Sequence, residues 1–107
     1  MPRNPPRPGP DQAREQLDQL YSDLATGKIE IGEAVRRMRH ISGLTQPEFA
    51  RHRGISVQAL RQIETGKANP TVATLNNIAS IFGLKTGFVP KTKAPRTPKR
   101  PQQTKRT

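Results

Sequence analysis

The spacing of helix-start residues within Leu44–Thr71 constrains the fold more than any other feature of this 107-residue chain. Thr45 and Glu48 have the three-residue spacing of a capping box, in which each side chain accepts a hydrogen bond from the other residue's backbone amide. Ser56 is a second helix cap, and Gly54 just before it can adopt the positive φ that a sharp turn requires. We therefore expect two short helices joined by a tight turn.

The second of these helices has two chemically different faces. Successive residues step by about 100° around a helix, which groups Ala59, Leu60 and Ile63 on the side that faces the core. The opposite side combines two amides, a cation and a small apolar group: Val57, Gln58, Arg61 and Gln62. Glutamine pairs with the major-groove edge of adenine, arginine pairs with guanine, and valine contacts a thymine methyl group. This face is predicted to read DNA bases; the alternative is that the glutamines are ordinary solvated side chains.

Apolar residues at helical spacing predict three further helices around this pair. The first covers Asp11 to Ala25 within a segment 11–27 and has an acidic outer face. The second runs from about Gly32 to Ser42, and the last begins after the cap residue Thr71. We expect the following residues of the last helix to face inward: Val72, Leu75, Ile78, Ile81 and Phe82.

The two ends of the chain have a different composition. Residues 1–10 contain five prolines and are expected to be a disordered leader. The segment KTGFVP at residues 85–90 is expected to form a short strand. Residues 91–107 repeat Lys, Arg, Pro, Thr and Gln without apolar spacing, which predicts a disordered basic tail. The predicted fold is therefore all-α, with a short C-terminal strand and a basic tail.

The charge of the chain indicates the class of its partner. The net charge is +11, and residues 84–107 contain eight Lys and Arg but no Asp or Glu. Such a cationic field attracts polyanions, of which nucleic acid is the first candidate; the alternative is a tail that only adds solubility. No apolar run is long enough to span a membrane, and the N-terminus lacks the apolar centre of a signal peptide. A cytoplasmic location is expected.

Residues with catalytic or metal-binding chemistry are few. The chain has no cysteine, which excludes disulfides and thiolate metal sites. His40 and His52 have basic neighbours and neither a partnering carboxylate nor the spacing of a metal site. The sequence contains no phosphate-binding loop and no nucleophile motif. We therefore expect a protein that is not an enzyme and that uses no cofactor, metal or small-molecule ligand.

Residues 31–84 resemble the xenobiotic-response-element family of helix-turn-helix regulators, which includes the lambda-type phage repressors and Cro. The resemblance rests on R-x-x-x-G-L-T-Q at Arg39–Gln46, G-I-S at Gly54–Ser56, and I-E-x-G-K at Ile63–Lys67 followed by N-P-T. It implies a lambda-repressor-like helix-turn-helix domain, preceded here by an extra helix. It also implies a homodimer that binds double-stranded DNA at a palindromic operator.

The resemblance implies which residues contact DNA. Gln46 would bond a phosphate and brace the recognition helix, and Gln58 and Gln62 would read bases. The other matching residues would contact bases or the sugar–phosphate backbone: Ser56, Val57, Arg61, Lys67, Asn69 and Thr71. Arg39 and Glu64 would form an internal ion pair.

One residue departs from the family pattern, and one segment indicates which branch of the family the chain resembles. Arg53 departs from the family, which usually has an apolar residue there. The segment TVATLNNIASIFGLKTGFVPK resembles the HipB-type antitoxin branch, in which a C-terminal strand pairs across the dimer. That branch implies a repressor of its own promoter that binds a HipA-like kinase toxin, with the helix at 11–25 either docking the toxin or packing on its own domain. The alternatives are a stand-alone phage or restriction-system regulator, or a bridging or scaffold protein that does not bind DNA.

Overall fold

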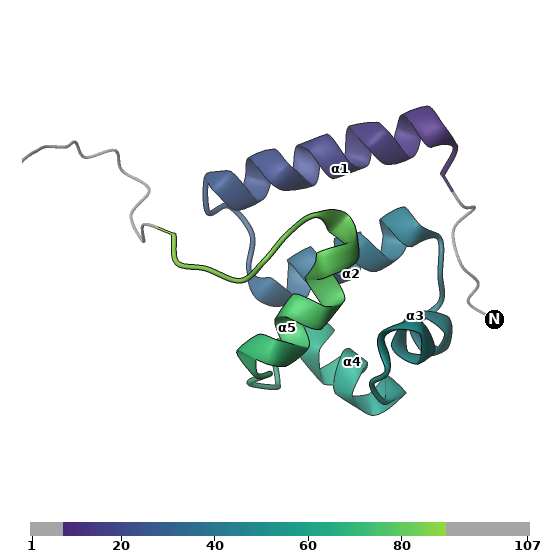
Figure 1. Ribbon diagram of the computed structural model, residues 1–107, viewed down its shortest axis with the longest axis vertical. Coiled ribbons are helices and arrows are strands. Elements are labelled where there is room, and N and C mark those ends of the chain that lie inside the picture. The colour runs from purple at the N-terminus through teal and green to yellow at the C-terminus, as the bar shows by residue number, and fades with distance from the viewer. Residues whose placement is uncertain (1–7, 90–107) are drawn as a thin grey trace, which may run out of the picture.

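The computed structural model describes residues 8–89, and all the regular structure there is helical (Figure 1). The elements in chain order are α1 (Pro10–Ala25), α2 (Ile31–Ser42), α3 (Gln46–Arg53), α4 (Val57–Glu64), α5 (Val72–Ala79) and a 3-10 helix, η1 (Ser80–Phe82). The predicted all-α fold is confirmed, and the expected bounds of the first two helices agree with α1 and α2 to within one residue.

The connection between α3 and α4 has the caps that the sequence predicts. The Thr45 hydroxyl accepts from the Glu48 amide at 3.2 Å, and the Glu48 carboxylate accepts from the Thr45 amide at 2.9 Å. Gly54 ends α3 with a left-handed φ of 71°. The Ser56 hydroxyl then accepts from the Ala59 amide at 3.0 Å and starts α4. Local side-chain chemistry thus defines both ends of the turn.

The helix α2 lies at the centre of the fold (Figure 1). It contacts α1 on one side and α4 on the other, and α5 also packs against it. A Cβ atom at Gly32, near the start of α2, would lie 2.8 Å from the carbonyl oxygens of Ile63 and Glu64. Only glycine therefore allows the start of α2 to approach the end of α4 this closely.

One core joins these helices. Four large side chains are almost completely buried, one from each of α1, α3, α4 and α5: Leu20, Phe49, Leu60 and Ile78. The helix α2 adds Ala34, Val35 and Met38, and the rings of Phe49 and Phe82 lie 6.5 Å apart between centroids. The helix α1 is therefore part of the same core as the other helices.

Two of the expected inward-facing residues of the last helix are instead exposed. Val72 is 59% exposed and Ile81 is 56% exposed, whereas Ala79 is buried. Val72 lies in the first turn of α5, before the part of this helix that contacts the core. Ile81 lies in η1, where the tighter 3-10 winding ends the α-helical register and turns this side chain outward.

The strand expected over residues 85–90 is absent from residues 85–89, and residue 90 lies outside the described part of the chain. A strand requires backbone pairing with a second strand, and residues 8–89 of a single chain contain none. The Thr86 amide instead donates to the Asn76 side-chain oxygen at 2.7 Å. Most of the predicted leader, residues 1–7, and the predicted basic tail, residues 91–107, also lie outside the described residues.

Candidate nucleic-acid interface

The helix α4 presents a polar outer face. Leu60 and Ile63 are buried in the core, while Gln58, Arg61 and Gln62 are exposed. These three side chains come from one helix and lie together on its solvent side. Val57, which the sequence assigns to the same face, is half-buried and packs against the core. Only part of the Val57 side chain is therefore available to a ligand on this face.

The loop after α4 folds back onto the end of this helix. The backbone amides of Lys67 and Ala68 both donate to the Gln62 carbonyl, at 2.8 and 3.2 Å. The side chains of Lys67 and Asn69 are exposed beside that helix end. Thr71 is also exposed and caps α5. The residues expected to hold the DNA backbone thus follow directly on the face expected to read bases.

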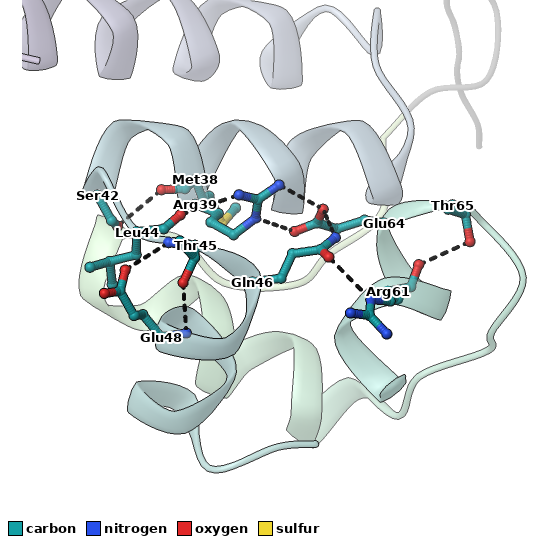
Figure 2. A network of polar contacts seen from close by, with 10 residues as sticks. All are labelled: Met38, Arg39, Ser42, Leu44, Thr45, Gln46, Glu48, Arg61, Glu64 and Thr65. Carbon is teal, nitrogen blue, oxygen red and sulfur yellow. Dashed lines mark hydrogen bonds and ion pairs between the residues drawn. The ribbon is translucent and has the colours of Figure 1, made fainter. Parts of the chain in front are cut away.

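A buried ion pair joins α2 to α4 behind this face (Figure 2). Arg39 Nε donates to Glu64 Oε2 at 2.8 Å, and Arg39 Nη2 donates to Glu64 Oε1 at 3.1 Å. Arg39 Nη1 also donates to the Leu44 carbonyl at 3.2 Å. This is the pair that the resemblance implies, and its parallel hydrogen bonds fix the relative orientation of the two groups.

Gln46 extends this pair to the surface. Its Nε2 donates to Glu64 Oε1 at 3.0 Å, and its Oε1 accepts from Arg61 Nε at 3.3 Å. Figure 2 shows the Gln46 side chain between Glu64 and Arg61. The structure thus brings together Arg39, Gln46, Arg61 and Glu64 from three elements, while Gln58 and Gln62 stay outside this network.

Sequence reasoning missed one contact that fixes the other end of α3. Arg53 Nη1 donates to the Asn77 carbonyl at 2.9 Å, and Asn77 Nδ2 donates to the Arg53 carbonyl at 2.6 Å. This reciprocal pair ties the last residue of α3 to α5. The only sequence feature that pointed to it is the unusual arginine at position 53, and no feature pointed to Asn77.

The exposed charges on α1 are mostly acidic, with Arg14 the exception, whereas those on α3 and α4 are basic. Asp11, Glu15 and Asp18 are exposed on α1, which lies on the side of α2 away from α3 and α4 (Figure 1). Arg51 and Arg61 are exposed on α3 and α4. A polyanion would therefore be attracted to the α3–α4 side and repelled by the outer face of α1.

Neither a cluster of metal-ligating side chains nor a membrane-spanning helix is present among residues 8–89. Within residues 8–89, no group of three or more His, Asp or Glu side chains is arranged to hold a metal ion. No helix in that part of the chain combines the length and the apolar character needed to cross a membrane.

Comparison with known proteins supports a single family. A family model described as a helix-turn-helix domain matches residues 30–87. The uncharacterized HTH-type transcriptional regulator y4dJ of Sinorhizobium fredii is 41% identical over 54 residues, which are 50% of this chain and 70% of that protein. The SPbeta prophage-derived uncharacterized HTH-type transcriptional regulator YonR of Bacillus subtilis is 35% identical over 58 residues, 54% of each protein.

A eukaryotic protein is also similar. Endothelial differentiation-related factor 1 of Rattus norvegicus is 31% identical over 70 residues, which are 65% of this chain and 46% of that protein. No solved structure matches the chain significantly. The family model covers α2 to η1 and leaves α1 outside. Because it matches more than half of the residues, this chain belongs to the helix-turn-helix domain family.

Proposed function

We propose that this protein is a sequence-specific DNA-binding transcription regulator that acts as a repressor in the cytoplasm. The observation that carries the proposal is the exposed face of α4, with Gln58, Arg61 and Gln62, supported from behind by a buried ion pair. Amide and guanidinium groups at one helix face match the hydrogen-bonding edges of adenine and guanine in the major groove. The names of y4dJ and YonR, both HTH-type transcriptional regulators, support the same function.

The proposed working form is a homodimer on a palindromic operator. Two copies of α4 related by a twofold axis would enter successive major grooves, about 34 Å apart or a multiple of this. Exposed apolar residues support self-association: Ile31, Phe88 and Val89 line a groove of about 640 Å³ between α2, α5 and residues 84–89. A dimer on the promoter would exclude RNA polymerase.

Replacement of Gln62 tests base reading. Gln62→Ala should weaken binding to the preferred site by about 1–3 kcal/mol and change binding to random DNA little, because only the preferred site supplies the matching base edge. Fluorescence anisotropy with labelled duplexes from the upstream region and with random duplexes measures both affinities. Gln16→Ala is the matched control, since Gln16 is an exposed glutamine on α1. An equal loss on both duplexes would disprove base reading by Gln62.

The predicted basic tail is proposed to contact phosphates without sequence preference. It lies outside the described residues, and its proposed role follows from its composition alone. Deletion of residues 91–107 should reduce the dependence of log Kd on log salt concentration and leave the preferred sequence unchanged. Titrations at four salt concentrations with the full chain and the deletion variant measure this slope. An unchanged slope would show that the tail does not contact DNA.

The finer proposal is an antitoxin that represses its own promoter and binds a HipA-like kinase toxin. Its support is the exposed acidic face of α1, which lies outside the family match and away from the proposed DNA face. A stand-alone phage-type regulator is the second candidate, and the prophage origin of YonR favours it. Co-purification of a kinase toxin from the native host, lost when Asp11, Glu15 and Asp18 are changed to lysine, would support the antitoxin. A scaffold that does not bind DNA would give no gel shift.

A further inference from the structure

The side-chain amide of Gln46 can be satisfied in only one orientation. On one side of it lies Glu64 Oε1, which accepts hydrogen bonds and cannot donate them; on the other lies Arg61 Nε–H, which only donates. The amide nitrogen must therefore face Glu64 and the amide oxygen must face Arg61. The reversed amide would place two acceptors together on one side and two donors together on the other.

Glu64, Gln46 and Arg61 form a hydrogen-bonded series, and its Glu64 end is rigid. Glu64 is 7% exposed, and the Arg39 guanidinium holds its carboxylate through two hydrogen bonds. Arg39 is itself fixed by a third bond to the Leu44 carbonyl. A planar fork on a buried carboxylate leaves little rotational freedom. Any group that hydrogen-bonds to this carboxylate therefore has a defined position.

The arginine end is exposed and has unused donors. Arg61 uses Nε to bond Gln46, and its backbone carbonyl accepts from the Thr65 hydroxyl at 2.9 Å. Among residues 8–89, neither terminal nitrogen of Arg61 has a hydrogen-bond partner. The two nitrogens of this end of the guanidinium match the spacing of N7 and O6 on guanine.

We infer that Glu64 is a positioning residue that sets, through the Gln46 amide, the direction in which Arg61 presents its guanidinium to a guanine base. The inference rests on the proposed function, because it concerns how the same face of α4 recognises DNA. It assigns guanine to Arg61. It also gives Glu64, which is buried, a part in the sequence preference.

This role differs in its effect from a phosphate contact by Gln46. Loss of a phosphate contact weakens binding to all sequences about equally. Loss of positioning changes the preference at the base pair that Arg61 reads and leaves the other base pairs unchanged. The pattern of base preference therefore separates the two roles, which affinity for one duplex cannot do.

The experiment selects bound duplexes from a random library with the full-length protein and sequences them. Arg61→Ala should lower the preference for guanine at one base pair of each half-site by about tenfold. Gln46→Met, which keeps the side-chain length and the Arg39–Glu64 pair, should lower the preference at that same base pair by about threefold or more. Glu64→Gln should do likewise, because an amide at this position accepts either orientation of Gln46. The double variant Gln46→Met, Arg61→Ala should match Arg61→Ala alone.

Gln16→Met on α1 serves as the matched control and should select the wild-type sequence. Circular dichroism verifies that each variant is folded, and Gln46→Met decides the test if Glu64→Gln is unfolded. If the wild-type protein selects no sequence, both the proposed function and this inference are wrong. If it selects a site, but Arg61→Ala changes no base pair, Gln46→Met weakens all sequences equally, or folded Glu64→Gln keeps the wild-type preference, only the inference is wrong.

Discussion

Two arginines of α2, two residues apart, pair with helices on opposite sides of it. Arg37 makes one contact of 2.9 Å to Asp23 of α1, and the two side chains are 23% and 14% exposed. Arg39 makes two contacts to Glu64 of α4, and these side chains are only 11% and 4% exposed. The same helix thus holds α1 by a single, peripheral ion pair and α4 by a buried, bidentate one.

The difference leads us to expect different consequences when each contact is removed. The helix α1 adds a fully buried leucine, Leu20, to the core, and its single ion pair with α2 is peripheral, so its main contribution is apolar burial. The contact between α2 and α4 adds hydrogen bonds of defined direction. We therefore expect the α1 contact to affect stability alone, and the α4 contact to affect both stability and DNA recognition.

The largest expected effect tests the α1 side of this comparison. Leu20→Ala should lower the free energy of unfolding by about 4 kcal/mol, because it leaves a cavity at a fully buried site. The fraction that stays folded should keep the wild-type base preference. Urea denaturation and library selection measure the two quantities. Leu17→Ala, at a partly buried position of the same helix, should cost less; a changed base preference in Leu20→Ala would contradict the comparison.

The next effect concerns the α4 side. Arg39→Ala should lower the free energy of unfolding by about 3 kcal/mol, because it leaves the Glu64 carboxylate buried without its cation. It should also reduce the discrimination between preferred and random DNA. Thermal melts and anisotropy measure these effects. The control is Arg36→Ala, which breaks an exposed pair with Glu33 on the same helix and should change stability little. An unchanged melt for Arg39→Ala would show that the buried pair is dispensable.

The smallest effect is the pH dependence of the α1 contact. The hydrogen bond from Arg37, and then that from Gln19, hold the pKa of Asp23 below its ordinary value. The folded-state pKa is therefore lower than the unfolded-state pKa, so the stabilisation is complete at neutral pH and is lost as the pH falls through the folded value. Asp23→Asn should be less stable than wild type at pH 7 and equal to it in strong acid. A difference that persists in acid would rule out the carboxylate as its cause.

Local features of this fold were predictable from the sequence, and contacts between distant residues were not. Thr45, Glu48, Gly54 and Ser56 act within a few residues of their own positions, so their spacing predicts both helices and the turn. The two faces of α4 follow from helical periodicity in the same way. The exposure of Ile81 was not predictable, because it depends on where α5 tightens into η1.

The candidate site shows the same division. The sequence indicates which residues of α4 face outward, and the family pattern pairs Arg39 with Glu64. The hydrogen bond from Arg61 to Gln46 crosses 15 positions, and that between Arg53 and Asn77 crosses 24. Such contacts depend on how helices pack against each other, which no local pattern encodes. The branch-specific strand failed for a related reason, since a strand requires a partner that one chain does not supply.

The close approach at Gly32 has a consequence for anyone who re-engineers this protein. The positive end of the α2 dipole lies against the negative end of α4, and even one added methyl group at position 32 would force the backbones apart. The displaced residue would be Glu64, which holds Gln46 and, through it, Arg61 by hydrogen bonds. Mutant libraries built to alter the exposed face of α4 should therefore keep this glycine constant, although Gly32 is itself buried and lies on a different helix.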